Sequence, residues 1–321
     1  MQDVFSKNLS DIISEFEAGK YEQALQALKK LNENSYLLEE KMEIAHIFTA
    51  LGLVDDAKQI LNNISGQANH IDILRLKAEI SYKEGDFDTA LEIMHRVIDE
   101  QANAEDYSFI SQIYYDDGLP EVSYRYINKA IEESKNNAYY FYQRGVYAYE
   151  FGKIEEAIES FKRAIEIDGN ELIYLLALGE AFYSIGQFED ALYYFDQVLK
   201  ADSENESALY LKGMLLLHLE EVSEGIELLK KASELQSENI EILVSLSDAY
   251  EMENNLVESL KILERIQEID EYYLPALKRL ANIYLYQEEW DKAKEIIERA
   301  SAVDPEDVSV QQMSNLINEK A

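Results

Sequence analysis

The 321-residue chain contains no cysteine, only 3 prolines and 12 glycines, and few basic residues. Without cysteine it cannot form disulfides, thiolate metal sites or a cysteine nucleophile. Because proline and glycine are rare, helices can continue without interruption, and we expect a mostly helical chain. Apolar runs are too short to span a bilayer, and the N-terminus lacks the basic and apolar regions of a signal peptide. These absences predict a cytoplasmic protein.

The shortage of basic residues leaves a strongly acidic chain. It has 29 Lys and Arg against 64 Asp and Glu, and therefore a net charge of −35. Nucleic acids and anionic membranes are bound mainly by cations that meet phosphates, so we expect neither as a partner. Two interpretations of the acids stay open. They form a solvated surface that keeps the protein soluble, or they attract a partner that carries a basic segment.

The sequence also lacks the motifs of common catalytic and metal sites. Its 4 histidines are widely spaced and form no metal-ligand pair. It contains neither a glycine-rich phosphate loop nor a Gly-x-Ser-x-Gly turn. Paired carboxylates are too abundant in so acidic a chain to indicate a site. We therefore expect no catalytic residue, no metal ion and no cofactor, and a protein that is not an enzyme.

What the chain does contain is a small residue that recurs every 33 or 34 positions. The positions are Ala24, Ala57, Ala90, Ser123, Ala157, Ala191, Gly225, Ser259 and Ala293. Between successive members lie two segments of about 12 to 14 residues with the apolar spacing of amphipathic helices. A small side chain lets paired helices approach closely. A glycine such as Gly152 lies between the two helices of a pair, where a positive φ ends the first of them. The period predicts an array of helical hairpins.

The residues from Gly179 to Val198 resemble a tetratricopeptide repeat. Phe182, Gly186 and Phe188 lie at the aromatic, glycine and aromatic positions of that family, and the small positions match as well. In the last three repeats, the turn glycine is replaced by Glu220, Asn254 and Glu288. The resemblance extends from about residue 5 to residue 305. It implies an all-α fold, a right-handed α-solenoid of about nine helix-turn-helix repeats with a C-terminal capping helix.

We expect the repeat array to occupy residues 1–305 and the capping helix to occupy residues 306–321. The acid and proline at Asp304 and Pro305 have the order of a helix start. The residues predicted to face inward from the capping helix are Val310, Met313, Leu316 and Ile317. Those predicted to face water are Gln311, Gln312, Asn315 and Glu319, as a terminal repeat requires.

In the tetratricopeptide repeat family the first helix of each pair lines a concave groove that binds partners. At one groove position, four successive repeats carry Tyr82, Tyr115, Tyr149 and Tyr183. The resemblance adds three further tyrosines, which are Tyr139, Tyr142 and Tyr210, and four acids, which are Glu79, Asp116, Glu150 and Glu180. Tyrosine offers a large contact area and a hydroxyl at low entropic cost. The alternatives stay open that the tyrosines pack between repeats and that the acids are only solvated.

The resemblance therefore implies a non-catalytic scaffold or adaptor that binds a partner protein or peptide in a tyrosine-rich, acidic groove. A basic segment in the partner would suit such a groove. The alternative is a peptide-sensing regulatory protein whose repeat array changes shape when a ligand binds. The sequence indicates neither the identity of the partner nor the oligomeric state.

Overall fold

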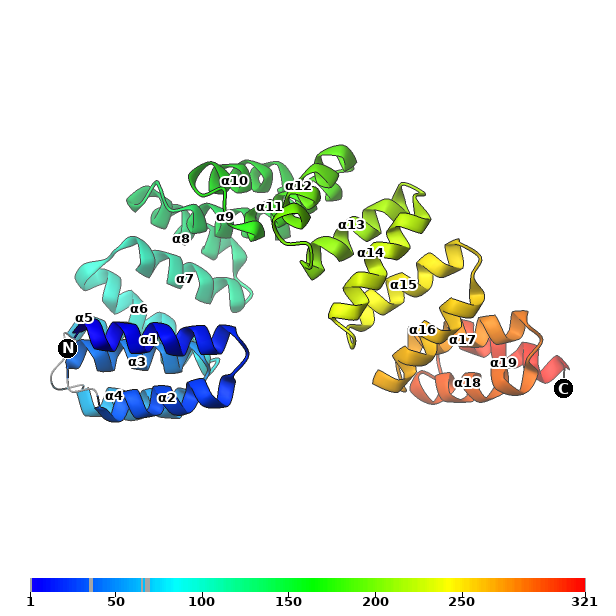
Figure 1. Cartoon of the computed structure of the whole chain (residues 1–321), viewed down its shortest axis with the longest axis horizontal. Helices are drawn as coiled ribbons and strands as arrows, with labels where there is room; N and C mark the ends of the chain where they lie inside the picture. Colours follow the sequence, from blue (N-terminus) through cyan, green and yellow to red (C-terminus); the bar gives the residue numbers. More distant parts are fainter. Residues whose placement is uncertain (1, 35–36, 65, 67–69, 321) are drawn as a thin grey trace. The chain divides into compact units, whose positions relative to one another are not determined.

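The computed structural model describes residues 2–34, 37–64, 66 and 70–320, and within these residues it contains nineteen helices and no strand (Figure 1). The chain divides into two compact units, unit 1 (Met1–Lys153) and unit 2 (Ile154–Ala321). The helices described in unit 1 are α1 (Gln2–Glu17), α2 (Tyr21–Asn34), α3 (Leu38–Ala50), α4 (Val54–Ile64), α5 (His70–Lys83), α6 (Phe87–Gln101), α7 (Ala104–Asp116), α8 (Pro120–Glu133) and α9 (Ala138–Glu150).

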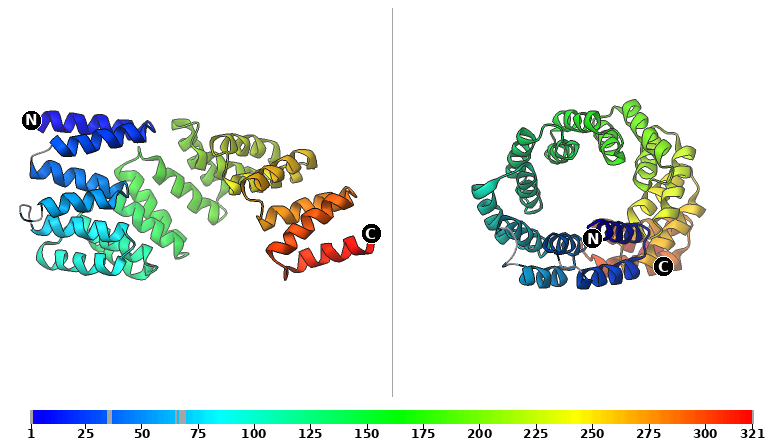
Figure 2. Two further views of the ribbon diagram at one scale, coloured as in Figure 1. Left: turned by 90° about the horizontal axis from the view of Figure 1, so that it is seen from below. Right: turned by 60° about the vertical axis from the view of Figure 1, so that its left-hand side comes forward.

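The helices described in unit 2 are α10 (Ile154–Ile167), α11 (Leu172–Ser184), α12 (Phe188–Ala201), α13 (Glu206–His218), α14 (Val222–Leu235), α15 (Ile240–Met252), α16 (Leu256–Ile269), α17 (Leu274–Tyr286), α18 (Trp290–Val303) and α19 (Val308–Lys320). Within each unit, consecutive helices pack side by side (Figure 2). From α1 to α18, we call the odd-numbered helices first helices and the even-numbered ones second helices. The predicted all-α repeat solenoid is confirmed.

The recurring small residue is buried on the second helix of every repeat. Gly225 shows why its size matters. A Cβ atom there would lie 2.8 Å from Cδ2 of Leu217 and 3.0 Å from the carbonyl oxygen of Gly213. The first and second helices of this repeat, α13 and α14, thus approach so closely that even a methyl group would collide. The predicted close approach of the paired helices is confirmed.

The turn inside each repeat has a residue with positive φ, as predicted. In six repeats it is a glycine, such as Gly152 with φ 70°. Where glycine is replaced, the same conformation persists, with φ of 64° at Glu220, 61° at Asn254 and 59° at Glu288. The packing of the two helices therefore fixes this backbone conformation even where the residue does not favour it.

The C-terminal helix α19 differs from the prediction in its start and in one of its side chains. It begins at Val308, and Oδ1 of Asp307 accepts a hydrogen bond from the backbone N–H of Val310 at 3.0 Å. Pro305 lies in the preceding turn, so the predicted start there was wrong. Leu316 is 42% exposed, so its predicted inward orientation was also wrong.

The rest of the predicted stripe on α19 is confirmed, because Val310, Met313 and Ile317 are all buried. These three recur at steps of three and four residues, whereas Leu316 lies off that stripe. Gln311, Gln312 and Asn315 are exposed, as predicted. The side chain of Glu319 falls outside the described residues. Among the described helices, none combines the length and the apolar character needed to cross a membrane.

Candidate functional site

The residues predicted to line the groove all lie on first helices, and they fall in both units. Unit 1 holds Glu79 and Tyr82 on α5, Tyr115 and Asp116 on α7, and Tyr139, Tyr142, Tyr149 and Glu150 on α9. Unit 2 holds Glu180 and Tyr183 on α11 and Tyr210 on α13. The structure therefore groups eight of the eleven in unit 1, and each unit is described by itself.

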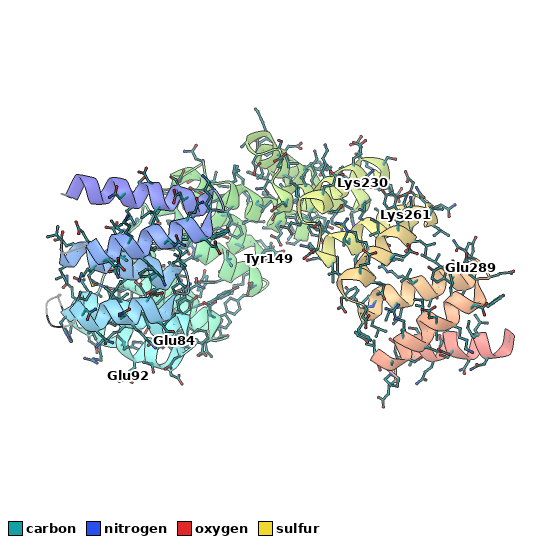
Figure 3. All side chains as sticks on the ribbon, turned by 60° about the horizontal axis from the view of Figure 1, so that its bottom comes forward. Glu84, Glu92, Tyr149, Lys230, Lys261 and Glu289 are labelled. Carbon is teal, nitrogen blue, oxygen red and sulfur yellow. The ribbon has the colours of Figure 1, made fainter. Side chains whose placement is uncertain are left out.

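The four tyrosines that share one groove position are all half-buried. The ring of Tyr82 packs on that of Phe87 with centroids 5.8 Å apart, and the ring of Tyr183 packs on Phe188 at 6.0 Å. Each of these phenylalanines is the first residue of the second helix that follows. Part of each ring therefore covers the turn between two helices, while the remainder is exposed. Tyr149, labelled in Figure 3, is the last residue but one of α9.

Two of the tyrosines donate hydrogen bonds to acids of the next repeat. The hydroxyl of Tyr82 donates to Asp116, and the hydroxyl of Tyr115 donates to Glu150. Burial, together with the accepting carboxylate, raises the pKa of both tyrosines above the usual value of 10.0. These pairs were not predicted. Their signal in the sequence is an acid placed directly after a groove tyrosine, as in Tyr115-Asp116 and Tyr149-Glu150.

A chain of hydrogen bonds joins α7 to α9 in unit 1. Oγ of Ser108 donates to Oε1 of Gln143 at 2.7 Å, and Nε2 of Gln143 donates to Oε1 of Gln112 at 3.4 Å. Nε2 of Gln112 then donates to the carboxylate of Asp116 at 3.0 Å. Ser108 and Gln143 are buried, so this chain fixes the orientation of the partly exposed Gln112 amide. Sequence reasoning did not identify Ser108, Gln112 or Gln143.

Beside these hydrogen bonds lies a cleft of about 330 Å³, which we call the amide cleft. Its lining residues are Glu105, Ser108, Phe109, Gln112, Asn137, Tyr139, Tyr140 and Gln143. Tyr139 is 49% exposed, and its ring lies 6.2 Å from that of Tyr142. Of the predicted residues, only Tyr139 is among those that line the cleft. The polar side chains around the cleft were not predicted from the sequence.

Unit 2 has a different cleft, of about 410 Å³, which we call the methionine cleft. Its lining residues are Tyr183, Met214, Leu217, His218, Glu220, Ser245, Asp248 and Met252. The ring of His218 meets that of Tyr183 edge-on at 6.4 Å. Thioether and aromatic walls with acids among the lining residues suit a side chain that is apolar along its stem and charged at its tip.

The other two predicted residues of unit 2, Glu180 and Tyr210, do not line this cleft. The hydroxyl of Tyr210 donates to Glu241 of the next first helix at 3.1 Å. Burial raises the pKa of Glu180, whose carboxylate makes no ion pair with any residue that the structure describes. A half-buried carboxylate without a cation is a favourable place for a cation supplied by a partner.

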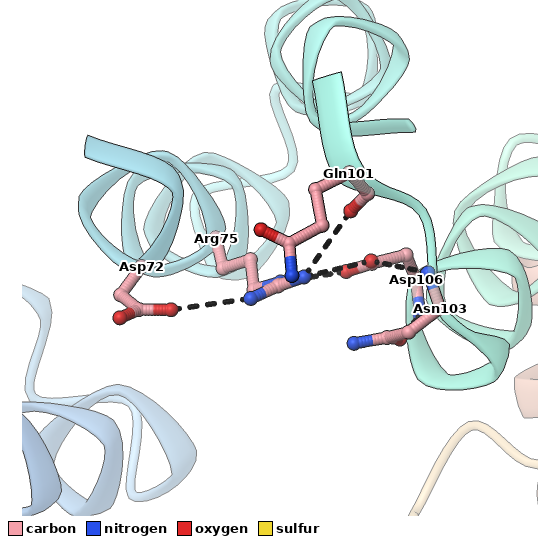
Figure 4. A network of polar contacts seen from close by, with 5 residues as sticks. All are labelled: Asp72, Arg75, Gln101, Asn103 and Asp106. Carbon is pink, nitrogen blue, oxygen red and sulfur yellow. Dashed lines mark hydrogen bonds and ion pairs between the residues drawn. The ribbon is translucent and has the colours of Figure 1, made fainter. Parts of the chain in front are cut away.

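Three cations of the first helices, Arg75, Lys278 and Arg279, are by contrast already paired with acids. Nε of Arg75 donates to Oδ1 of Asp106 at 2.8 Å, and Nη2 donates to Oδ2 at 3.0 Å (Figure 4). Asp106 also accepts the backbone N–H of Asn103 and completes the cap of α7. Arg75 donates further to Asp72 and to the backbone carbonyl of Gln101. Four of the five N–H groups of the Arg75 guanidinium are thus engaged within the protein.

The same pairing recurs at the C-terminal end and in the second repeat. Lys278 lies 2.8 Å from Asp307, and Arg279 pairs with Asp248. Nδ1 of His46 lies 2.7 Å from Oε2 of Glu79, and this contact raises the pKa of His46. Among the predicted acids, Glu79 is therefore partnered by a base. No described cation pairs with Asp116, Glu150 or Glu180.

The comparisons with known proteins agree with this architecture. A family model described as the tetratricopeptide repeat protein 21 ARM repeat matches residues 133–296, about half of the chain. A tetratricopeptide repeat protein from Parabacteroides merdae has a similar structure, with a TM-score of 0.59 and 15% identity over 77% of this chain and 98% of that one. A comparison with curated proteins gives no match.

Two further solved structures share the fold. PilF from Pseudomonas aeruginosa has a TM-score of 0.57 and 15% identity, and the match covers 66% of this chain and 97% of that one. The C-terminal part of a repeat-containing protein from Cytophaga hutchinsonii has a TM-score of 0.50 and 15% identity, over 85% of this chain and 98% of that one. At this level of identity the likeness extends to the fold alone.

Proposed function

Because this chain belongs to the tetratricopeptide repeat family, we propose that it is a non-catalytic scaffold or adaptor that binds a partner protein or peptide through its first helices. The observation that supports the proposal most is an imbalance of charge. Arg75, Lys278 and Arg279 are each engaged by an acid within the protein. The acids of three first helices, Asp116, Glu150 and Glu180, pair with no described cation. Lys83 on α5 has no acid partner among the described residues, and its Nζ lies 5.8 Å from the centroid of the Tyr82 ring. The three unpaired acids outnumber it, so the net charge that is left for a partner is negative.

The chemistry of these surfaces favours a segment that carries Lys or Arg. Tyrosine rings attract cations through their faces, and carboxylates strengthen the attraction where water is partly excluded. In the methionine cleft, Met214 and Leu217 offer apolar contact for the stem of such a side chain, and Glu220, which pairs with no described cation, lies among the lining residues. A basic segment in the partner and a cytoplasmic location stay predictions from the sequence.

The test is a neutralised variant that keeps the shape of the side chains. We would combine Asp116→Asn, Glu150→Gln and Glu180→Gln and compare partner capture from an extract of the source cells with that of the unchanged protein. The matched control combines Glu155→Gln, Glu189→Gln and Glu224→Gln, which removes three exposed acids from second helices.

We expect the first-helix variant to lose most of the capture and the control variant to keep it. Capture by the unchanged protein should also weaken as salt is raised, because exposed charges are screened. Equal capture by both variants would show that the acids of the first helices do not hold the partner. The helical circular dichroism signal checks that each variant is folded.

A further inference from the structure

The ion pair between His46 on α3 and Glu79 on α5 carries an inference that rests on the proposed function and concerns its regulation. We propose that His46 competes with the basic segment of a partner for Glu79, and that it stops competing when it loses its proton as the pH rises. Unit 1 thus binds a cationic partner more tightly at mildly alkaline pH than at mildly acidic pH.

His46 and Glu79 occupy the same repeat position on successive first helices, 33 residues apart. Counted onward in steps of 33 or 34 residues, this position holds Gln112, Met214 and Asp248 in three later repeats. Gln112 lines the amide cleft, and Met214 and Asp248 line the methionine cleft. Residues at this position therefore face the side of the first helices on which the proposed function places a partner.

The pair is open to a competing cation. Nδ1 of His46 lies 2.7 Å from Oε2 of Glu79, and the two side chains are 40% and 35% exposed. Water and a ligand can therefore both reach the carboxylate. Because a carboxylate that already has a cation beside it attracts a second one less strongly, the protonated imidazole and a partner's Lys or Arg compete for Glu79.

On α5, two acids act on His46. The hydrogen bond to Glu79, together with the charges of Glu79 and Asp72, raises the pKa of His46 above its usual value of 6.5, although burial opposes the rise. Asp72 is shared with Arg75, whose Nη1 donates to it at 3.1 Å. Lys83 lies one turn after Glu79 but sits over a tyrosine ring. Among the described bases, His46 is therefore the one that holds Glu79.

The charged residues on the other helices that pack on α3 are engaged with each other. Lys29 of α2 pairs with Asp56 of α4 at 3.1 Å, and Lys58 of α4 pairs with Glu84 at 2.5 Å. On α3 itself, Glu43 lies one turn before the histidine and is exposed. The pH response therefore depends on one imidazole and one carboxylate, with Asp72 in support.

Loss of the proton changes what a partner meets at Glu79. A neutral imidazole can still donate a hydrogen bond to the carboxylate, but it no longer offsets its charge. Linkage is reciprocal, so a cation that binds at Glu79 lowers the pKa of His46 and releases a proton. Affinity therefore rises with pH, and because the pKa of free His46 lies above 6.5, the rise falls at neutral to mildly alkaline pH.

The probe for the test is a capped octapeptide of alternating arginine and glycine. Its dissociation constant for the full chain is measured by calorimetry at low salt, at pH 6 and at pH 8.5. His46→Gln removes the competing charge, His46→Lys keeps it at both pH values, and Glu79→Gln removes the acid. The matched control is His70→Gln, because His70 is 62% exposed and lies 3.9 Å from Glu100 of the second helix α6.

We expect the peptide to bind the unchanged protein and His70→Gln about threefold more tightly at pH 8.5 than at pH 6, which is the effect of one exposed ion pair. At pH 6, His46→Gln should bind about threefold more tightly than the unchanged protein. His46→Lys and Glu79→Gln should bind weakly at both pH values. Equal binding by His46→Gln and the unchanged protein at pH 6 would overturn the inference.

A second measurement needs no variant. The histidine side chains of the full chain are titrated by NMR with and without the octapeptide. We expect the peptide to lower the pKa of His46 by about 0.5, the counterpart of a threefold change in affinity, and to leave that of His70 nearly unchanged. Should His46→Gln fail to fold, this titration decides alone. A pKa of His46 that does not respond to the peptide refutes the competition.

Failure of this inference can be separated from failure of the proposed function. If a partner is captured through Asp116, Glu150 and Glu180 while His46 does not respond to the octapeptide, the scaffold function stands and the regulation by pH is excluded. If capture does not depend on these three acids, the proposed function fails. The NMR titration then still decides whether His46 gives way to a cation at Glu79.

Discussion

The hydroxyl of Tyr115 donates a hydrogen bond to the carboxylate of Glu150, which lies one repeat further along the chain. Tyr82 and Asp116 stand in the same relationship one repeat earlier. In both pairs the donor is near the C-terminal end of one first helix, and the acceptor is the last residue of the next. The bond exists only while the tyrosine keeps its proton, because a phenolate beside a carboxylate would be repelled.

These pairs predict a loss of stability at alkaline pH. The pKa of Tyr82 and of Tyr115 is raised in the folded protein, whereas in the unfolded chain both titrate near the usual value of 10.0. Above that pH the unfolded state has released protons that the folded state still holds, so the free energy of unfolding falls as pH rises. We expect the combined variant Tyr82→Phe and Tyr115→Phe to show a shallower fall between pH 9.5 and pH 11 in urea unfolding.

The control for this prediction replaces two tyrosines that are largely exposed. Tyr21 is 67% exposed and Tyr193 is 58% exposed, so Tyr21→Phe combined with Tyr193→Phe should leave the alkaline slope nearly unchanged. The two double variants remove the same number of phenol groups. If their slopes were equal, the hydrogen bonds to Asp116 and Glu150 would have no part in the effect.

The regular features of the fold could be predicted because they follow from steric limits that repeat along the chain. A helix pair that approaches as closely as α13 and α14 tolerates only a small residue at Gly225. The repeat is therefore visible in the sequence as a small residue that recurs at a regular interval. The positive φ of the turn persists at Glu220 and Asn254, where the sequence gives no direct sign of it. Periodicity predicted these turns even though their residues alone would not.

The irregular features could not be predicted because they depend on how particular helices cross. Leu316 has the spacing of an inward residue, yet it lies beside the stripe that α19 buries. The bond from Tyr115 to Glu150 and the amide chain through Gln112 need the distance between two first helices, which the sequence does not contain. Which tyrosines contact a partner stays a prediction.

The turns without glycine predict that stability can be gained there. A residue other than glycine in the left-handed region costs about 1–2 kcal/mol. Substitution by glycine removes this strain, but it also gives the unfolded chain more conformational freedom, which offsets part of the gain in stability. We expect Glu220→Gly and Glu288→Gly each to raise the free energy of unfolding by about 0.5–1 kcal/mol. Asn254→Gly should change it less, because asparagine tolerates this conformation better. Urea unfolding measures each change.

The matched control is Glu253→Gly, at a residue with φ −74°. Here glycine brings no relief of strain and adds freedom to the unfolded chain, so we expect a loss of up to about 1 kcal/mol. A gain at Glu253 equal to that at Glu220 would mean that removal of a negative charge from an acidic chain, and not backbone strain, explains the result.

The contact between Gly179 and Phe195 predicts a coupled pair of substitutions. A Cβ atom on Gly179 would lie 2.7 Å from Cε1 of Phe195, whose ring is fully buried. Overpacking of this kind costs about 1–3 kcal/mol, against a gain of about 1 kcal/mol in helix propensity from alanine. We expect Gly179→Ala to destabilise unit 2 by up to about 2 kcal/mol, and Gly169→Ala, with no atom closer than 3.4 Å, to be nearly neutral.

The second substitution shows whether the ring is the cause. Phe195→Leu shortens the side chain and should cost about 1–2 kcal/mol by itself, because it leaves a cavity. In the combined variant the new methyl group occupies part of that cavity. We expect the total loss to be smaller than the sum of the two single losses by at least 0.5 kcal/mol. Simple addition of the losses would show that the two residues do not compete for space.

The ion pair between Arg75 and Asp106 predicts a large cost when only the cation is removed. The side chain of Asp106 is 4% exposed, so without the guanidinium its charge would be left in a poorly solvated place. Removal of one partner of a buried pair typically costs about 3–5 kcal/mol, and the 25% exposure of Arg75 places the expected cost somewhat below that range. We expect Arg75→Leu to lower the free energy of unfolding by about 2–3 kcal/mol in urea.

The cause of that loss can be isolated by adding Asp106→Asn to Arg75→Leu. Asparagine can still accept the backbone N–H of Asn103 that caps α7, but it carries no charge, so the combined variant should recover about 1 kcal/mol or more. The control is Arg163→Leu, which breaks an exposed pair with Glu166 and should cost at most about 0.5 kcal/mol. If Arg75→Leu cost no more than Arg163→Leu, water would have to reach Asp106 in the folded protein. No recovery on adding Asp106→Asn would assign the loss to the packing of the arginine stem, and the network in Figure 4 would then hold α5 and α7 together by contact more than by charge.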